Sequence, residues 1–169
     1  MYVALVISDI RSTHNVGSLL RTCDGLGIEA VYMTGITPYP AGHPDDHRLP
    51  HLAKKIDTAI HKTALGAEHS VPWLYHPNTA HIITKLKKDG WTIFALEQHP
   101  SSQAIDTIEV PDKVALVVGN EVDGVPEDIL VMCDQIVEIP MVGTKESFNV
   151  SVAGALGLYT LKKNWTKLN

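Results

Sequence analysis

The sequence predicts an α/β fold, in which a mostly parallel sheet is flanked by helices. Residues 2–8 and 114–118 are nearly continuous apolar runs of strand length, as in strands that are covered on both faces. An amphipathic segment separates the first run from another apolar run at residues 30–34, which is the pattern of a strand–helix–strand unit. Turns rich in glycine and polar side chains follow the later apolar runs. Such turns are typical of ligand sites at the carboxyl ends of parallel strands.

The helix after the first strand is expected to start near His14 or Asn15, with Asn15 as its N-cap, and to end at Gly25 and Gly27. Gly17 lies one turn before Arg21 on one face of this helix. We therefore expect that face to leave the Arg21 guanidinium open to a ligand. The opposite face is a stripe of apolar residues at helical spacing, predicted to be buried: Val16, Leu19, Leu20, Cys23 and Leu26.

The remaining segments continue the alternation of strands and helices. We found no repeat, low-complexity tract or linker, so residues 1–169 are predicted to form a single domain. The expected elements are a loop at 35–50, a short helix at 51–60, an edge strand at 71–75 containing Pro72, a helix at 78–88, a strand at 91–96, a polar connection with one helical turn at 97–112, a short helix with Pro126 at N1, a strand at 136–139 and a helix at 149–164.

The last helix is unusually rich in small residues. Two glycines in its interior each cost a helix about 1 kcal/mol, so they need a compensating reason. We expect another backbone to pass very close, from a cofactor-binding loop, a neighbouring subunit or both. A plain core helix with an alanine-rich side is the alternative. The small residues are Ser151, Ala153, Gly154, Ala155 and Gly157.

Composition indicates a soluble globular protein. The chain is 44% hydrophobic and 20% charged, and no apolar run is long enough to span a membrane. Cys23 and Cys133 lie in apolar patterns and are interpreted as reduced core residues, which favours the cytoplasm. The net charge of −5 argues against nucleic-acid binding by bulk electrostatics but leaves room for a local basic patch. Candidate clusters, each alone more typical of a solvated helix face, are Lys54, Lys55 and Lys62; Lys85, Lys87 and Lys88; and Lys162, Lys163 and Lys167.

Several common site motifs are absent. Val125 stands where a phosphate-binding loop would carry lysine, and no Gly-x-Gly-x-x-Gly follows a strand, so NAD and ATP chemistry are disfavoured. Ser147 lacks the glycine-flanked turn of a serine hydrolase. Prolines interrupt the one histidine-rich segment, so a solvated loop is favoured there over a metal site. That segment contains His43, Asp45, Asp46, His47 and His51.

Three motifs, in chain order, resemble those of the TrmH branch of the SPOUT RNA methyltransferases. Residues 62–68 and 95–98 are also similar to that family, so the resemblance covers nearly the whole chain. Phe148 departs from the leucine that the family usually has. The motifs are Asn15-x-Gly17-x-x-x-Arg21, Gly119-x-Glu121 with Gly124, and Ile139-Pro-Met141 followed by Ser147-Phe-Asn149-Val-Ser151.

The resemblance implies a deep trefoil knot at the C-terminal end of the sheet. It also implies a bent S-adenosylmethionine bound in the knot, a homodimer with its sites at the subunit interface, and no metal or membrane. The methyl acceptor would be a ribose 2′-hydroxyl of RNA, with tRNA favoured over rRNA. The N-terminal RNA-binding extension of some relatives is not expected here. A catalytically inactive module of the same fold that binds RNA or the cofactor is the alternative, and a metabolic enzyme that uses no nucleotide is a third possibility.

The resemblance also implies roles for individual residues. Arg21 would clamp the RNA phosphate and stabilise the developing alkoxide. A role as general base is less suited to it, because free guanidinium has a pKa above about 12. Asn15 would orient Arg21 or the ribose, and Glu121 would favour the cationic cofactor. Ser147 and Asn149 would hold the target nucleotide. Backbone groups that would hold the adenine and ribose of the cofactor are those of Leu96, Gly119, Ile139, Met141 and Phe148.

Overall fold

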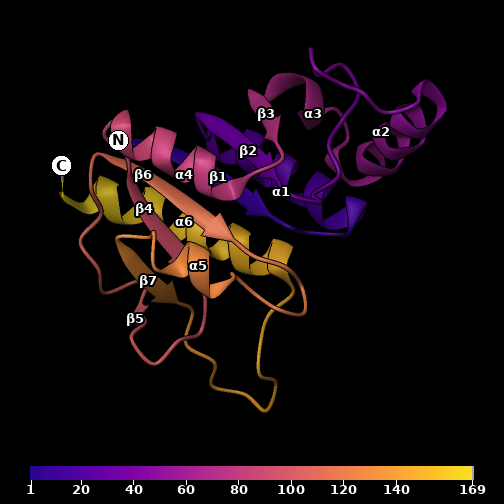
Figure 1. Ribbon diagram of the computed structural model, residues 1–169. Coiled ribbons are helices and arrows are strands. Elements are labelled where there is room, and N and C mark those ends of the chain that lie inside the picture. Colours follow the sequence, from indigo (N-terminus) through magenta and orange to yellow (C-terminus); the bar gives the residue numbers. More distant parts are fainter. Residues whose placement is uncertain (169) are drawn as a thin grey trace.

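A parallel sheet forms the centre of the protein. The computed structural model describes residues 1–168, with the side chains of residues 1–163. The sheet has seven strands in the order β3-β2-β1-β6-β4-β7-β5, and every neighbouring pair is parallel, as predicted (Figure 1). The strands are β1 (Tyr2–Ser8), β2 (Ala30–Thr34), β3 (Trp73–His76), β4 (Thr92–Leu96), β5 (Gln103–Ala104), β6 (Lys113–Val118) and β7 (Gln135–Glu138).

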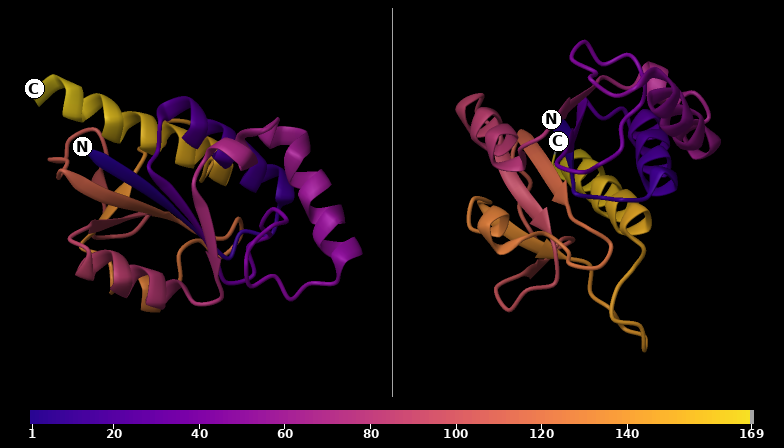
Figure 2. Two further views of the ribbon diagram at one scale, coloured as in Figure 1. Left: turned by 90° about the horizontal axis from the view of Figure 1, so that it is seen from above. Right: turned by 45° about the vertical axis from the view of Figure 1, so that its right-hand side comes forward.

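Helices cover both faces of the sheet. Seen from above, α1 and α6 lie on one side of the sheet and α4 on the other, with α2 outside α1 (Figure 2). The loop before α6 extends away from the body of the molecule (Figure 2). The helices are α1 (Thr13–Leu26), α2 (Pro50–Ala64), α3 (Ala67–Ser70), α4 (Thr79–Lys88), α5 (Glu127–Leu130) and α6 (Val150–Leu168).

Alternation along the central strands creates two hydrophobic cores. Leu5 and Ile7 of β1 face the core beneath α1 and α6, whereas Ala4 and Val6 face the core beneath α4 and α5. Burial on both faces explains the continuous apolar runs in the sequence. The predicted stripe of α1 is confirmed: Val16, Leu19, Leu20 and Cys23 are fully buried, and Leu26 is partly buried.

The N-terminal end of α1 corrects one prediction. Ser12, and not Asn15, is the N-cap: its hydroxyl accepts a hydrogen bond from the backbone N–H of Asn15 at 3.3 Å. The helix therefore begins one to two residues earlier than predicted. Asn15 lies within the first turn, so its side chain is available for contacts outside the helix.

Other boundaries differ by a few residues. The second helix is longer than the predicted 51–60, because it continues to a left-handed cap at Leu65. Pro126 is the N-cap of α5 and not its first residue, and the last helix begins at Val150 and not at Asn149. In the 97–112 connection, the predicted helical turn is wrong. The connection contains β5, which pairs with Val137 and Glu138 of β7.

The small residues of α6 make room for side chains of the same chain. A Cβ built on Gly154 would lie 2.6 Å from Leu19 Cδ2, and one on Gly157 would lie 2.9 Å from Leu116 Cδ2. Within the chain, leucine side chains of α1 and β6 therefore explain the two glycines, and no loop backbone of the same chain passes close to them. The close approach of a neighbouring subunit stays a prediction. On its outer side α6 exposes an apolar stripe of Val152 (46% exposed), Leu156 (41%) and Tyr159 (55%).

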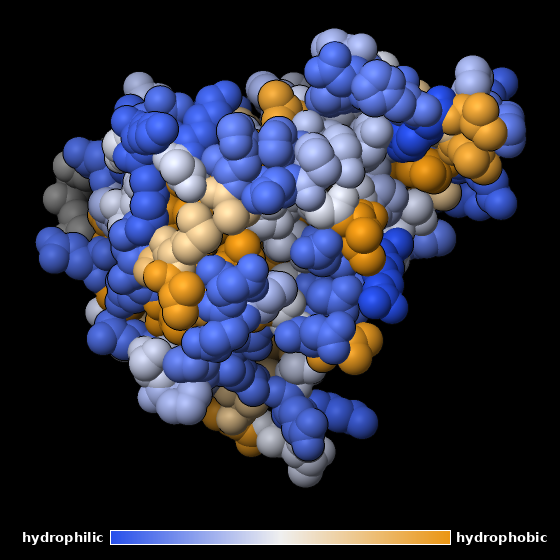
Figure 3. All heavy atoms as spheres, viewed as in Figure 1, coloured by the Kyte–Doolittle hydropathy of each residue, from blue (hydrophilic) through white to orange (hydrophobic). Residues whose placement is uncertain are grey.

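The surface is mainly hydrophilic on the face seen in Figure 3, where hydrophobic side chains form small separate patches. The described part of the chain contains no helix with the length and apolar character that crossing a membrane requires.

Candidate active site

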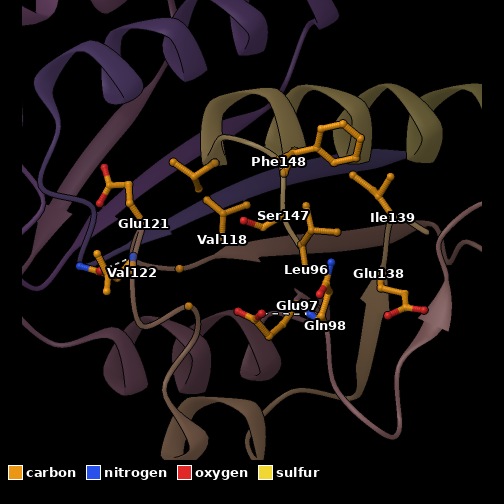
Figure 4. A pocket seen from close by; sticks show the side chains of 15 residues that line it. Leu96, Glu97, Gln98, Val118, Glu121, Val122, Glu138, Ile139, Ser147 and Phe148 are labelled. Carbon is orange, nitrogen blue, oxygen red and sulfur yellow. Dashed lines mark hydrogen bonds between the residues drawn. The ribbon is translucent and has the colours of Figure 1, made fainter. Parts of the chain in front are cut away.

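A cavity lies at the carboxyl ends of β4, β6 and β7, beside the start of α6 (Figure 4). It brings together residues that are up to 57 positions apart, between Leu96 and Ala153. Of the predicted cofactor-binding residues, all but Met141 line it; of the predicted catalytic residues, Glu121 and Ser147 do. Its lining consists of Leu96, Glu97, Gln98, Val118, Gly119, Asn120, Glu121, Val122, Gly124, Glu138, Ile139, Ser147, Phe148, Val150 and Ala153.

The turn after β6 forms one wall of the cavity. Asn120 and Gly124 exchange two backbone hydrogen bonds, of 2.9 and 3.0 Å, which close the turn. A Cβ on Gly119 would overlap the backbone of Gly124 and Val125, so the turn closes only around a glycine. Gly124 has φ +68°, a left-handed conformation that also favours glycine. The two glycines of the second motif are thus explained by backbone geometry.

Asn120 anchors this turn to the end of β1, a role that sequence reasoning missed. Its side chain is largely buried, and its Nδ2 donates to the carbonyl of Asp9 at 2.7 Å. Its Oδ1 accepts from the backbone N–H of Val122 at 2.9 Å. Asn120 lies in a turn, so the periodicity of helices and strands does not single it out. The only signal in the sequence is that asparagine side chains often bond backbone groups within turns.

Glu97 and Gln98 hold the other loops of the cavity in place. The Glu97 carboxylate accepts from the backbone N–H of Val125 at 2.8 Å and from that of Gln98 at 3.0 Å. Gln98 Nε2 donates to the carbonyl of Glu146 at 2.7 Å, which fixes the loop before α6. These two residues lie in the 95–98 segment that resembles the family, and they were not predicted individually.

A polar network joins α1, the β6 turn and α6 at the edge of the cavity. Asn15 Nδ2 donates to Glu121 Oε1 at 3.0 Å, and Asn149 Nδ2 donates to Asn15 Oδ1 at 3.3 Å. Asn149 also accepts from the backbone N–H of Ser151 at 2.9 Å, so it caps the first turn of α6. Asn15, Glu121 and Asn149, from three distant segments, are therefore brought together as predicted.

The Glu121 carboxylate is held in its ionised form. Partial burial raises the pKa of this group, but hydrogen bonds from the Asn15 side chain and from the backbone N–H groups of Arg11 and Ser12 outweigh that effect. The result is a pKa below the usual value of 4.5. A negative charge therefore persists beside the cavity at neutral pH.

We expect the stabilising contribution of Glu121 to disappear in acid. Because its pKa is lowered on folding, the contribution is fully present above the unfolded value of 4.5 and is lost as the pH falls through the lower folded value. Urea unfolding of wild type and Glu121→Gln should therefore differ most at pH 5–7 and should converge toward pH 3. A difference in unfolding free energy that stays constant over this range would contradict the assignment.

Arg21 does not line the cavity of its own chain. It lies two turns further along α1 than Asn15 and lines a separate hollow with Ser18, Thr22, Lys62 and Thr63. The Asn15 side chain bonds Glu121 and Asn149, and no hydrogen bond to Arg21 is formed by Asn15 among the described residues. Gly17 is buried and not part of an open face, because α2 packs against it.

The other candidate sites have structural explanations. In the described part of the chain, no three His, Cys, Asp or Glu side chains are grouped to hold a metal ion. The predicted solvated loop around His43 is confirmed for Asp45, His47 and His51, which are exposed, whereas His43 is partly buried and stacks on Trp73 with ring centroids 6.1 Å apart. Burial raises the pKa of the Cys23 thiol to about 12, so this cysteine is an inert core residue. In the basic clusters, Lys167 lies outside the described side chains.

The cavity combines apolar surface with acidic side chains. Phe148 and Ile139 lie toward one end, and Glu121 lies at the other (Figure 4). Leu96 and Val118 add apolar surface between them. Glu138 lies beside Ile139, and Glu97 lies between the two ends (Figure 4). A planar, weakly polar ring system fits the apolar side chains, and the carboxylates of the lining favour a cationic group. These residues suit a nucleoside that carries a positive charge.

Comparison with known proteins identifies the family. A family model described as the SpoU rRNA Methylase family matches residues 2–159. The chain belongs to this family. The chain is also similar to the 23S rRNA (guanosine-2′-O-)-methyltransferase RlmB of Neisseria meningitidis, with 33% identity over 154 residues. That match covers 91% of this chain and 55% of the relative, so the chain spans about half the length of the curated SpoU relative.

Solved structures agree on the SpoU fold. The SpoU methyltransferase AviRb from Streptomyces viridochromogenes, in complex with the cofactor AdoMet, superposes with a TM-score of 0.81 at 19% identity, covering 98% of this chain and 58% of that one. A protein studied for the 2-OH methylation of C/U34 on tRNA superposes with a TM-score of 0.79 at 21% identity. That match covers 98% of this chain and 97% of the other protein. At these identities the likeness shows the fold alone.

Proposed function

We propose that this protein is an S-adenosylmethionine-dependent methyltransferase that modifies a ribose 2′-hydroxyl of RNA. The observation that carries the proposal is the cavity at the strand ends with the network of Asn15, Glu121 and Asn149 at its edge. Supporting it, the chain belongs to the SpoU family, and relatives are named as guanosine 2′-O-methyltransferases of 23S rRNA and of tRNA.

The cavity residues fit the proposed cofactor. S-adenosylmethionine, when bound, supplies a methyl group activated by a positively charged sulfur. Leu96, Ile139 and Phe148 would provide the apolar surface for adenine, and backbone groups at Gly119 would bind the ribose edge. Met141, the other predicted backbone contact, does not line the cavity. Phe148, where the family usually has leucine, presents a larger flat surface to the ring. Glu121 favours the cation, and Glu97 and Glu138 add negative charge to the lining.

The reaction depends on placing the ribose hydroxyl in line with the activated methyl group. Holding two reactants in this way can supply about 7–11 kcal/mol of the barrier. Arg21 clamps the RNA phosphate and stabilises the negative charge that develops on the 2′-oxygen. Ser147, which lines the cavity, and Asn149 hold the target nucleotide. Asn15 positions this group through its hydrogen bonds to Glu121 and Asn149.

We propose that a homodimer completes the site. Arg21 lies outside the cavity of its own chain, so a second copy must bring its Arg21 to that cavity. The exposed stripe of Val152, Leu156 and Tyr159 on α6 starts between the cavity residues Val150 and Ala153, and it supplies an apolar surface for that contact. The predicted trefoil knot belongs to this proposal, as does a cytoplasmic location. The meeting of the β4, β6 and β7 loops at one sheet edge supports the knot.

Leu156→Asp is expected to convert the dimer to a monomer, because it places a charge in the centre of the apolar contact. Light scattering after size exclusion at micromolar concentration measures the mass. Val131→Asp is the matched control, since Val131 is 73% exposed at the end of α5, across the sheet from α6. Methylation should be lost with the dimer. A wild-type protein that is monomeric would overturn the shared site.

We favour tRNA over rRNA as the substrate. The protein studied for C/U34 methylation of tRNA is matched over 97% of its length, whereas RlmB is matched over 55%. The part of the protein given by these residues thus matches nearly the whole of a protein studied for methylation of tRNA.

Incubation with labelled S-adenosylmethionine and total RNA, followed by nucleoside mapping, tests the function. We expect label in a 2′-O-methylated nucleoside of the tRNA fraction. Calorimetry with S-adenosylmethionine separates the alternatives: heat of binding without transfer to RNA would identify an inactive binding module. Absence of heat would identify an unrelated enzyme.

A further inference from the structure

We propose that the hollow between α1 and α2 binds a backbone phosphate of the RNA, and that Lys62 acts there together with Arg21. The inference rests on the proposed function and extends it to a second RNA-binding residue. Ser18, Arg21 and Thr22 of α1 and Lys62 and Thr63 of α2 line the hollow. The chain that supplies Arg21 to a site therefore supplies Lys62 with it.

Gly17 is the residue that brings the two helices together. A Cβ at this position would overlap Thr63 Oγ1 and the carbonyl of Ile60, so α2 approaches α1 closely only because residue 17 is glycine. Thr63 Oγ1 donates to the carbonyl of His14 at 2.9 Å and fixes the contact. The glycine of the first motif is thus explained by the docking of α2, which places Lys62 beside Arg21.

The two cations of the hollow lack compensating charges. Among the described residues, the side chains of Arg21 and Lys62 form no ion pair and no hydrogen bond. By contrast, Arg48 pairs with Asp46 at 2.6 Å and Lys87 with Asp134 at 2.7 Å. Two neighbouring positive charges repel each other, and a bound anion removes that repulsion.

The remaining groups of the hollow suit a phosphate oxygen. The hydroxyls of Thr22 and Thr63 already donate to backbone carbonyls, whereas the Ser18 hydroxyl donates to no group in the described chain. The guanidinium, the ammonium and the Ser18 hydroxyl therefore provide donors from three sides. Because the chain has a net charge of −5, RNA needs such a local positive site for attachment.

Lys62→Ala tests the proposal in the full-length protein. We would measure the binding of a fluorescein-labelled tRNA pool by anisotropy at several salt concentrations. Loss of one phosphate contact should raise the Kd several-fold and reduce the slope of log K against log salt by about 1. The KM for RNA should rise by a similar factor, with kcat within about two-fold of wild type, because uniform binding is lost. Lys62→Arg should restore most of the affinity.

Lys85→Ala is the matched control, because Lys85 is an exposed lysine of α4, on the opposite face of the sheet. It should leave the Kd and the salt slope unchanged. The proposal would be overturned if Lys62→Ala bound RNA with the Kd and salt slope of the wild type. It would also be overturned if Lys85→Ala lost as much RNA affinity as Lys62→Ala, or if the wild type bound no RNA. If Lys62→Ala weakens binding but the wild type methylates no RNA, the proposed function fails and the phosphate site stands.

Discussion

Replacing Arg21 with alanine is expected to lower kcat for RNA methylation by at least about 100-fold, the usual effect of losing a donor that stabilises an oxyanion. The Kd for S-adenosylmethionine should stay within a few-fold of wild type, because Arg21 does not line the cavity of its own chain. Single-turnover kinetics at saturating RNA and calorimetry with the cofactor measure the two quantities separately.

Arg21→Lys is the control for charge. Lysine keeps the positive charge but loses the planar fork that binds a phosphate through two hydrogen bonds. We expect it to retain most of the RNA affinity and to recover only part of kcat. Wild-type turnover by Arg21→Ala would show that the arginine has no part in the chemical step.

Gly119→Ala should abolish measurable cofactor binding and also destabilise the protein. The added methyl group would overlap the backbone of Gly124 and Val125, and backbone cannot move aside as a flexible side chain can. Overpacking of this kind costs about 1–3 kcal/mol, and the shifted turn would displace Glu121 from the cavity. Calorimetry with S-adenosylmethionine and urea unfolding measure the two effects.

Gly143→Ala provides the comparison. Gly143 belongs to the loop before α6, and a Cβ there would meet no atom within 4 Å. This variant should bind the cofactor and unfold as wild type does. If Gly119→Ala behaves in the same way, the turn after β6 does not shape the binding site.

Hydrophobic patterning was sufficient to predict the sheet and its main helices. The continuous apolar run of β1 indicates a strand that is buried on both faces. The apolar stripe from Val16 to Cys23 indicates a helix that packs against the core with one face. The motifs predicted which loops meet, because parallel strands bring their carboxyl ends to one edge. That rule brought Glu121 and Ser147 into one cavity, and the network joined Asn15 and Asn149 to its edge.

The errors concern features that depend on tertiary contacts. β5 has only two residues and exists because it pairs with β7, so no local pattern reveals it. In the sequence, Gly17 suggested an open helix face, but in the structure α2 packs against it. Asn120 and Glu97 act through hydrogen bonds to backbone groups that are distant in sequence, at Asp9 and Val125. Such partners cannot be found by periodicity.

The order of the strands affects how the protein is made. In the centre of the sheet, β1 pairs with β6, and Tyr2 lies opposite Lys113. At ribosomal rates of roughly 5–20 residues per second, β1 waits on the order of 5–20 s before its neighbour has been synthesised. During that interval the nascent chain carries an uncovered apolar strand edge, which is prone to aggregation. Chaperone protection during translation is therefore expected to determine the yield of this protein.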